Sequence, residues 1–209
     1  MCNRFRFLLF SCAMLLGGWP TMLLAYVPVQ PLQPLQPLQS SSTSSFLLIA
    51  SRKMKDPRFR EAVILVTRHG HNGPIGIIVN HPQDATLDKI FPAYPLSRGF
   101  RLFTGGPVNP KQVSYLFRGG EALAGTINVS EHIYLAYSMP LLGELLGGAR
   151  AHTGLRVVSG FAAWAPGQLE NEIAHGNWYI LPIDSEAIFD RPVAEMWLEL
   201  FRHATTVSH

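Results

Sequence analysis

Cysteine and charge are both scarce in this chain of 209 residues, which has two cysteines and 15% charged residues. Both cysteines, Cys2 and Cys12, lie within the first 25 residues. A chain cut after that stretch would have no cysteine, which excludes disulfides, thiolate catalysis and cysteine-bound zinc for it. The 47% of hydrophobic residues excludes a mostly disordered chain, and the length suits one ordinary domain.

Several motifs of catalysis and nucleotide binding are also missing from the sequence. It has no Gly-x-x-x-x-Gly-Lys-Ser/Thr loop, no Gly-x-Gly-x-x-Gly turn and no Gly-x-Ser-x-Gly elbow. These absences exclude a P-loop NTPase and a Rossmann dinucleotide site, and they leave an α/β-hydrolase nucleophile unsupported. The chain also lacks a helix-turn-helix signature and a strongly basic helix. We therefore do not expect it to bind nucleic acid directly.

The apolar N-terminal segment has the features of an export signal. Two arginines begin it, an apolar run follows, and Ala25 ends an imperfect small-residue cleavage site. We interpret residues 1–25 as signal-peptide-like, which predicts export to the periplasm. Two alternatives stay open: an uncleaved membrane anchor, and a start at Met22 that would leave the protein in the cytoplasm. We expect membrane contact only through residues 7–25, and only if they are retained.

A low-complexity linker is predicted to separate this segment from the folded domain. Residues 26–45 contain Pro-Leu-Gln three times and then a Ser/Thr run, a composition typical of a spacer. The domain is expected over residues 46–209. Without the two N-terminal arginines the formal net charge falls from +3 to +1, so the basic character belongs mainly to the N-terminal segment. Five basic residues near the domain start are interpreted as a solvated loop: Arg52, Lys53, Lys55, Arg58 and Arg60.

Short apolar and β-branched runs predict a strand-rich domain. We expect strands over residues 46–50, 62–67, 75–80, 101–104, 113–117, 133–137, 156–161 and 178–181. We expect helices over residues 139–146, 166–175 and 193–203. A glycine-containing loop joins the second and third strands, which predicts an antiparallel hairpin. Since strands outnumber helices without strict alternation, the predicted fold class is α+β, a single domain with a largely antiparallel sheet.

Three segments of the predicted domain have an unusual composition. In residues 56–59, Asp-Pro is followed closely by phenylalanine. In residues 104–108, two glycines before a proline allow a sharp turn and a close approach to another part of the backbone. In residues 164–170, a tryptophan ends a strand, and proline and glycine precede a helix whose first N–H groups are free. A helix cap beside a core tryptophan would also explain the third segment.

These segments, with two others, resemble the YqgE/AlgH family. The matching stretches are Leu-Ile-Ala-Ser at 48–51, Asp-Pro-Arg-Phe at 56–59, Gly-Ile-Ile-Val-Asn-His-Pro at 76–82, Gly-Gly-Pro-Val at 105–108 and Trp-Ala-Pro-Gly-Gln-Leu-Glu at 164–170. The similarity extends over residues 46–203. It implies a curved sheet folded towards a pseudo-barrel and carries over no established enzymatic reaction. The family is sometimes labelled a transcriptional regulator, and this label implies at most a regulatory role. The family is also typically cytoplasmic.

A candidate ligand-binding surface follows if these segments converge. Asn80 and Gln168 would supply directional hydrogen bonds, and Trp164 an apolar wall, while the helix N-terminus would add a partial positive charge. The predicted site comprises Asn80, Gly105, Gly106, Pro107, Trp164, Gly167, Gln168 and Glu170. The sequence thus favours a non-enzymatic domain that binds an unknown small ligand or protein partner.

Two other classes of function stay open. A hydrolase or transferase would need acid–base groups, for which His69, Asp56 and Glu170 are the candidates. A cell-envelope interaction module would instead explain the signal-like segment and the linker. His69 and His71 could contribute two metal ligands, but no third is spaced near them, so no metal and no cofactor is expected. Glu170 and Glu172 lie two apart on a predicted helix and would point in different directions.

Overall fold

The computed structural model describes residues 45–67, 73–94, 97, 100–148 and 154–207. The signal-like segment predicted over residues 1–25 and nearly all of the linker lie outside these residues, so both stay predictions. So do the expected roles of His69 and His71, which also lie outside the described residues. Within the described part, none of the helices has the length and hydropathy of a membrane span.

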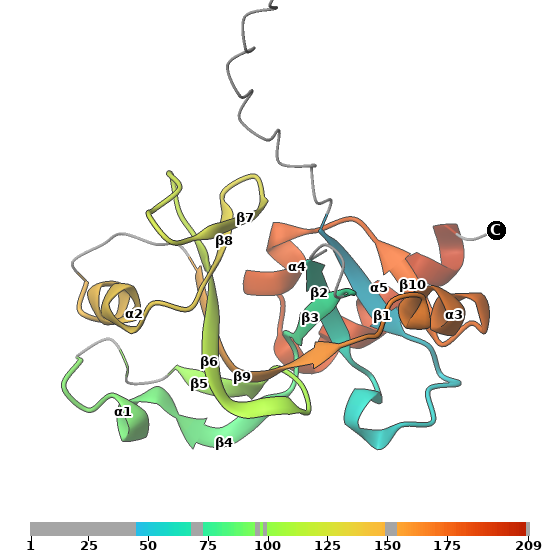
Figure 1. The fold of residues 1–209 in the computed structure, drawn as a ribbon, viewed down its shortest axis with the longest axis horizontal. Helices are drawn as coiled ribbons and strands as arrows, with labels where there is room; N and C mark the ends of the chain where they lie inside the picture. Colours follow the sequence, from blue (N-terminus) through green and yellow to red (C-terminus); the bar gives the residue numbers. More distant parts are fainter. Residues whose placement is uncertain (1–44, 68–72, 95–96, 98–99, 149–153, 208–209) are drawn as a thin grey trace, which may run out of the picture. The chain divides into compact units, whose positions relative to one another are not determined.

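The described residues form ten strands, five α-helices and one 3₁₀ turn, arranged as shown in Figure 1. The strands are β1 (Phe46–Ala50), β2 (Val63–Thr67), β3 (Ile75–Ile78), β4 (Pro82–Thr86), β5 (Arg101–Thr104), β6 (Val108–Arg118), β7 (Ile127–Ser130), β8 (Ile133–Ala136), β9 (Gly154–Ala163) and β10 (Trp178–Leu181). The helices are η1 (Pro57–Phe59), α1 (Leu87–Ile90), α2 (Met139–Leu146), α3 (Gln168–Ala174), α4 (Ser185–Phe189) and α5 (Val193–Val207).

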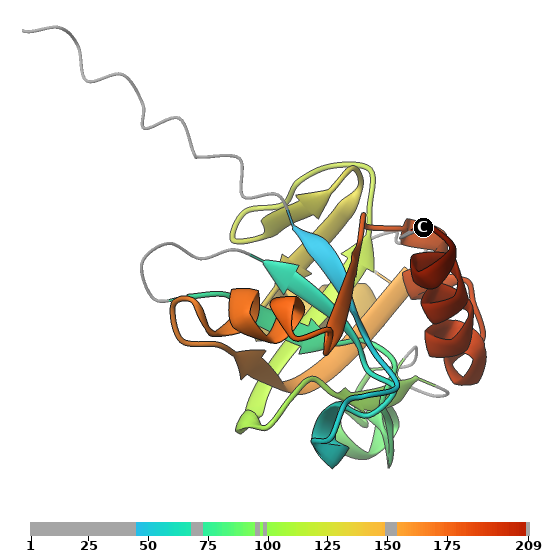
Figure 2. The ribbon, with the colours of Figure 1, turned by 90° about the vertical axis from the view of Figure 1, so that its right-hand side faces the viewer.

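All ten strands belong to one sheet, in the order β10-β1-β2-β3-β9-β6-β8-β7, with β5 on β9 and β4 on β5. Every pair is antiparallel except β5 with β9. The predicted hairpin is confirmed, with Ile64 opposite Ile78 across β2 and β3. The sheet curves strongly (Figure 2). The predicted α+β class with a largely antiparallel, curved sheet is therefore confirmed.

Strand β9 joins the two parts of the sheet visible in Figure 1. Its first half pairs with β6, for example Val157 opposite Tyr115, and its end pairs with β3 through Ala162 opposite Gly76. Gly160 lies between the two stretches with a φ of 74°, a backbone conformation that glycine adopts without strain. The turn at this residue leads β9 towards Trp164, which follows the strand directly.

Both faces of β1 are buried, which explains its uninterrupted apolar sequence. Because side chains alternate across a strand, Leu47 and Ile49 belong to the core cluster that α5 covers. Leu48 belongs instead to the cluster that contains Trp164 and Trp178 and that residues of α3 help to cover. This second cluster carries the candidate site.

Apart from the three-residue turn η1, four short elements were not predicted from the sequence: β4, β7, α1 and α4. Each has four or five residues, and β4 consists of Pro-Gln-Asp-Ala-Thr with no apolar alternation. Elements of this length depend on tertiary partners, because local propensity alone does not stabilise them. Helix α2 has the predicted bounds, with Ser138 as its N-cap and Gly147 as its C-cap in the structure.

Candidate ligand-binding site

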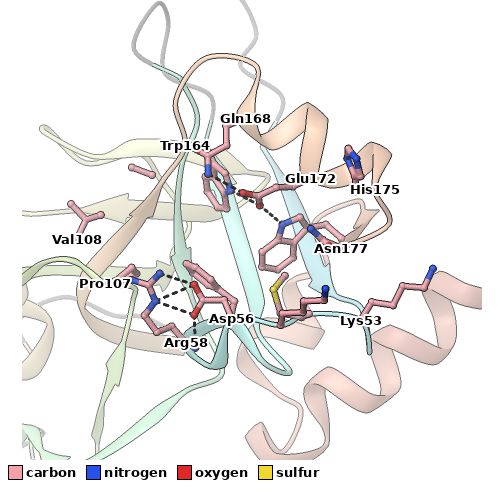
Figure 3. Close-up of a pocket in the computed structure, with 15 residues that line it drawn as sticks. Lys53, Asp56, Arg58, Pro107, Val108, Trp164, Gln168, Glu172, His175 and Asn177 are labelled. Atoms are coloured by element: carbon pink, nitrogen blue, oxygen red, sulfur yellow. Dashed lines mark hydrogen bonds and ion pairs between the residues drawn. The ribbon is translucent and has the colours of Figure 1, made fainter.

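A cleft of about 720 Å³ lies between the loop after β1, the η1 turn, the start of β6 and α3 (Figure 3). We call it the tryptophan cleft. The residues that matter most for its chemistry are Lys53, Lys55, Asp56, Arg58, Phe59, Pro107, Trp164, Gln168, Glu172 and Trp178. The cleft therefore combines an aromatic surface with charged residues of both signs.

Three aromatic rings pack against one another at the base of the cleft, and the two indoles among them are buried. Trp164 and Trp178 meet edge to face, with ring centroids 6.3 Å apart and an interplanar angle of 81°. Phe59 meets Trp178 in a similar arrangement at 5.9 Å. Trp164 follows the end of β9 and Trp178 begins β10, so the two strands and the intervening α3 bring the indoles together. Edge-to-face contacts of this kind stabilise aromatic pairs beyond their buried area.

Glu172 holds both indoles in place. Its Oε2 atom accepts hydrogen bonds from Nε1 of Trp164 at 3.1 Å and from Nε1 of Trp178 at 2.8 Å. Its Oε1 atom accepts a hydrogen bond from Nε2 of Gln168 at 2.9 Å, a pair that the four-residue spacing on α3 places on one face. The indole N–H groups are thus already used, and both indoles are buried, with Trp164 only 5% and Trp178 only 3% exposed.

An exposed ion pair lies on the other side of the cleft from Glu172 (Figure 3). The Arg58 guanidinium binds Asp56 in two places, with Nε 3.0 Å from Oδ1 and Nη2 2.6 Å from Oδ2. Asp56 Oδ1 also accepts a hydrogen bond from the Arg58 backbone N–H, which caps η1. The Arg58 side chain lowers the pKa of Asp56, and Asp56 in turn raises the pKa of Arg58. Asp56 is therefore ionised at neutral pH and paired with Arg58.

Part of the predicted site does come together. Pro107, Trp164 and Gln168 line the tryptophan cleft. Gly106 lines an adjoining hollow of about 240 Å³, which shares Arg58 and Pro107 with the cleft. Ligand binding by these residues stays a prediction, but they occupy one continuous stretch of surface.

Asn80 and Gly105, in contrast, make contacts that support the fold and do not face the cleft. The buried Asn80 side chain accepts a hydrogen bond from the Val63 backbone N–H and donates one to the Glu61 carbonyl, both at 2.8 Å. Gly105 packs directly against the backbone of Gly160 on β9. Neither residue lines the tryptophan cleft, and both hold strands in place.

Gly167 and Glu170 are exposed at the start of α3 and do not line the tryptophan cleft. Helix α3 has only seven residues, and Oε1 of Gln168 accepts a hydrogen bond from the Ala165 N–H at 3.1 Å. Glu170 and Glu172 do point in different directions. The hydrogen bonds of Glu172 were not predicted, although its four-residue spacing from Gln168 was a usable signal.

The acid–base and metal hypotheses gain no geometric support in the described part of the chain. Asp56 is held by Arg58, and Glu170 lies outside the cleft, while His69 is not among the described residues. No group of three His, Cys, Asp or Glu side chains in the described ranges is placed to hold a metal ion.

We expect His81 to make the stability of the domain depend on pH. Its side chain lines the hollow beside Gly106, and burial lowers its pKa below the ordinary value of 6.5, although Glu61 nearby acts in the opposite direction. The unfolded chain therefore binds the proton more readily, so the free energy of unfolding should fall as pH drops through 6.5. Urea denaturation at pH 7.5, 6.5 and 5.5 measures the effect. The variant His81→Gln should show a shallower pH dependence, and an unchanged slope would contradict the assignment.

Comparisons with known proteins agree on one family. The family described as AlgH-like matches residues 47–207. A UPF0301 protein from Methylococcus capsulatus is 34% identical over 169 residues, which cover 78% of this chain and 92% of that protein. A UPF0301 protein from Vibrio cholerae is 32% identical over 164 residues, which cover 74% of this chain and 87% of that protein.

Two solved structures share the fold. The solution structure of the AlgH protein from Pseudomonas aeruginosa has a TM-score of 0.65 and 24% identity, and the match covers 81% of this chain and 93% of that one. A crystal structure of a Corynebacterium diphtheriae protein also has a TM-score of 0.65, with 21% identity over 77% of this chain and 86% of that one. At these identities the likeness concerns the fold alone.

Proposed function

The chain belongs to the AlgH-like family, and from this premise we propose that it is a non-enzymatic regulatory domain whose tryptophan cleft binds a small ligand. The family resemblance alone supports the regulatory role. A protein partner that inserts a side chain into the same cleft is the alternative within this proposal.

The observation that carries the proposal is a cleft of small-molecule size that borders two indoles held in one orientation. Ligand sites in proteins typically enclose about 300–1,000 Å³ and are lined by apolar and aromatic side chains with a few polar groups. The tryptophan cleft has about 720 Å³, and Glu172 holds two of its three rings in one orientation. Side chains that are already ordered lose little conformational entropy on binding, which favours affinity.

The state of the two carboxylates also supports binding over catalysis. The Glu172 carboxylate accepts three hydrogen bonds, from Trp164, Trp178 and Gln168, and Asp56 is held in a bidentate pair with Arg58. A general acid or base needs a proton site that can reach the substrate. Both carboxylates instead shape the walls of the cleft.

Indole N–H signals in an NMR titration test this proposal. The full-length chain, labelled with ¹⁵N in its tryptophans, would be titrated with 2-naphthalenemethanol and with 2-naphthalenesulfonate as flat aromatic probes. At least one probe should shift the Trp164 and Trp178 signals, while Trp197, whose N–H donates to the Ala50 carbonyl away from the cleft, should shift little. If neither probe moves the Trp164 and Trp178 signals, the proposal is wrong.

Removal of the Glu172 carboxylate should weaken probe binding. In Glu172→Ala both indoles lose their acceptor and reorient, which we expect to raise the dissociation constant about tenfold, a change of about 1.4 kcal/mol. Glu172→Gln keeps one acceptor oxygen and should retain most of the affinity.

Glu170→Ala is the matched control, because this glutamate is on the same helix but outside the cleft. Calorimetric titration of all three variants gives the dissociation constants. Equal losses in Glu172→Ala and Glu170→Ala would exclude a specific role for Glu172.

A further inference from the structure

Strand β10 forms one outer edge of the sheet, because it pairs with β1 alone. We propose that this edge pairs with the same strand of a second copy of the chain, in an antiparallel arrangement that continues the sheet from one protomer into the other. The inference does not depend on the tryptophan cleft or on any ligand. It rests on the composition of β10, on the backbone groups that point away from β1 and on the exposure of Ile180.

The composition of β10 differs from that of the other two outer strands of the described sheet. β10 reads Trp-Tyr-Ile-Leu, with no charged residue, no proline and no register shift. β4 contains Pro82 and Asp84, and β7 has a register shift in its pairing with β8. Charges, prolines and bulges are devices by which proteins keep sheet edges from pairing with one another. β10 lacks all three, and most of its residues are of the aromatic and β-branched kinds that favour strands.

The hydrogen bonds between β1 and β10 show which backbone groups of β10 point outward. The Ser51 N–H donates to the Asn177 carbonyl at 2.9 Å, and these two residues continue the register of the strand pair. In an antiparallel pair every second residue exchanges hydrogen bonds with the partner strand, so Tyr179 points its N–H and C=O groups at β1. Trp178 and Ile180 point theirs the other way, and no second strand in the described part of the chain pairs with them.

These outward groups match a second copy of the same edge. A two-fold axis at Tyr179 would place Trp178 opposite Ile180 of the partner subunit, and Ile180 opposite Trp178 of the partner subunit. Each of these two pairs exchanges two hydrogen bonds, so the arrangement uses every outward N–H and C=O group of both strands. Pro182 follows the strand and has no N–H, which ends the ladder there. Because β10 carries no charge, the two strands meet without like-charge repulsion.

Helices α5 and α3 pack on the two faces of β10 but leave Ile180 open. Tyr179 meets Phe201 of α5 edge to face, with ring centroids 5.7 Å apart, and Trp178 belongs to the same core cluster as Leu169 of α3. Ile180 is 50% exposed, the highest value for a large hydrophobic side chain among the described residues. In the paired arrangement the two isoleucines, one from each copy, become diagonal neighbours on one face of the continuous sheet. The contact therefore removes apolar surface from water.

Analytical ultracentrifugation and residue-resolved amide exchange of the full-length chain test the proposal together. The chain should form a dimer in a concentration-dependent manner. When nine-tenths of the chain is dimeric, exchange at the Trp178 and Ile180 amides should be about tenfold slower than in the monomer, since only the monomer leaves them open to water. Tyr179, whose N–H faces β1 in each copy, is the internal control and should exchange slowly at every concentration. Association through any other surface would leave the Trp178 and Ile180 amides unprotected.

Ile180→Lys should separate the two copies. Lysine on an edge strand opposes edge-to-edge pairing, and the two new charges would be diagonal neighbours, so we expect the dissociation constant of the dimer to rise at least about tenfold. Ile90→Lys is the matched control, because Ile90 is 43% exposed but lies on α1, and this variant should dimerise like the parent chain. Ile180→Pro removes an N–H that the monomer does not use for β1 and should also weaken the dimer. Circular dichroism confirms that each variant is folded.

Three results would overturn the proposal. The first is a parent chain that stays monomeric up to millimolar concentration. The second is a dimer in which the Trp178 and Ile180 amides exchange as fast as in the monomer. The third is a folded Ile180→Lys variant that dimerises as tightly as Ile90→Lys. If both Ile180 variants fail to fold, the amide exchange of the parent chain still decides between the two outcomes.

Discussion

Replacement of Gly106 by alanine is expected to lower the free energy of unfolding by about 3 kcal/mol or more, through steric overlap and an unfavourable backbone conformation. The φ angle of Gly106 is 152°, a value that residues with a side chain rarely adopt. A Cβ atom at this position would lie 2.2 Å from the carbonyl carbon of Phe161 and 2.4 Å from the backbone nitrogen of Ala162. These backbone atoms belong to β9 and cannot move without disturbing the sheet.

The hydrogen bonds around this contact explain why so little displacement is possible. The N–H of Gly105 donates to the Ser159 carbonyl at 2.7 Å, and the carbonyl of Gly105 accepts from the Ile78 N–H at 2.8 Å. The segment therefore links β3 to β9 through its backbone. Any shift that makes room for a methyl group at Gly106 would lengthen these hydrogen bonds.

Urea denaturation followed by tryptophan fluorescence measures this effect. Gly120→Ala is the matched control, because a Cβ at Gly120 would meet nothing within 4 Å. We expect that control to change the free energy of unfolding by less than about 0.5 kcal/mol. A Gly106→Ala variant as stable as Gly120→Ala would contradict the close approach of the two backbone segments.

The second large effect is expected at Asn80. Asn80→Ala removes a buried side-chain amide and leaves the Val63 N–H and the Glu61 carbonyl without their hydrogen bonds. Each unsatisfied buried group costs about 1–3 kcal/mol, so we expect a total loss of about 2–4 kcal/mol. Glu61 has a φ of 56°, and the Asn80 amide helps to hold this turn in its strained conformation.

Two measurements separate this structural role from the ligand-binding role that the sequence predicted. Asn128→Ala replaces an exposed asparagine on β7 and should leave stability nearly unchanged in the same urea experiment. Titration with 2-naphthalenesulfonate should then show the parent affinity in Asn80→Ala under conditions where the variant stays folded. Unchanged stability together with lost probe affinity would instead make Asn80 a ligand group.

Strands and helices with a clear pattern were predictable, because the order of apolar and polar residues in a short stretch of sequence indicates which side chains are buried. β1 lies at its predicted position, since both of its faces are buried and its sequence is apolar throughout. β4 was missed because its residues are largely polar and its stability comes from pairing with β5. A strand of that kind leaves no pattern that a local sequence window can detect.

The candidate site was only partly predictable for a related reason. Trp164 and Gln168 were recognised within one short segment, and both do line the cleft. Trp178 and Lys53 come from other parts of the chain and reach the cleft because β1 and β10 pair, with Ala50 opposite Trp178. No motif connects these residues in the sequence, so their proximity was not visible there.

The sequence by itself determined the α+β class, the resemblance to the family and most of the longer elements, because each depends on composition or on patterns within a short stretch. Only the tertiary structure decided which of the eight predicted residues share a surface. It assigned Glu172 to the two indoles, Asn80 to the β2 backbone and Gly105 to its contact with β9. These assignments depend on tertiary contacts, namely the pairing of β2 with β3, the packing of α3 beside β10 and the close approach of Gly105 to Gly160, none of which a short stretch of sequence reports.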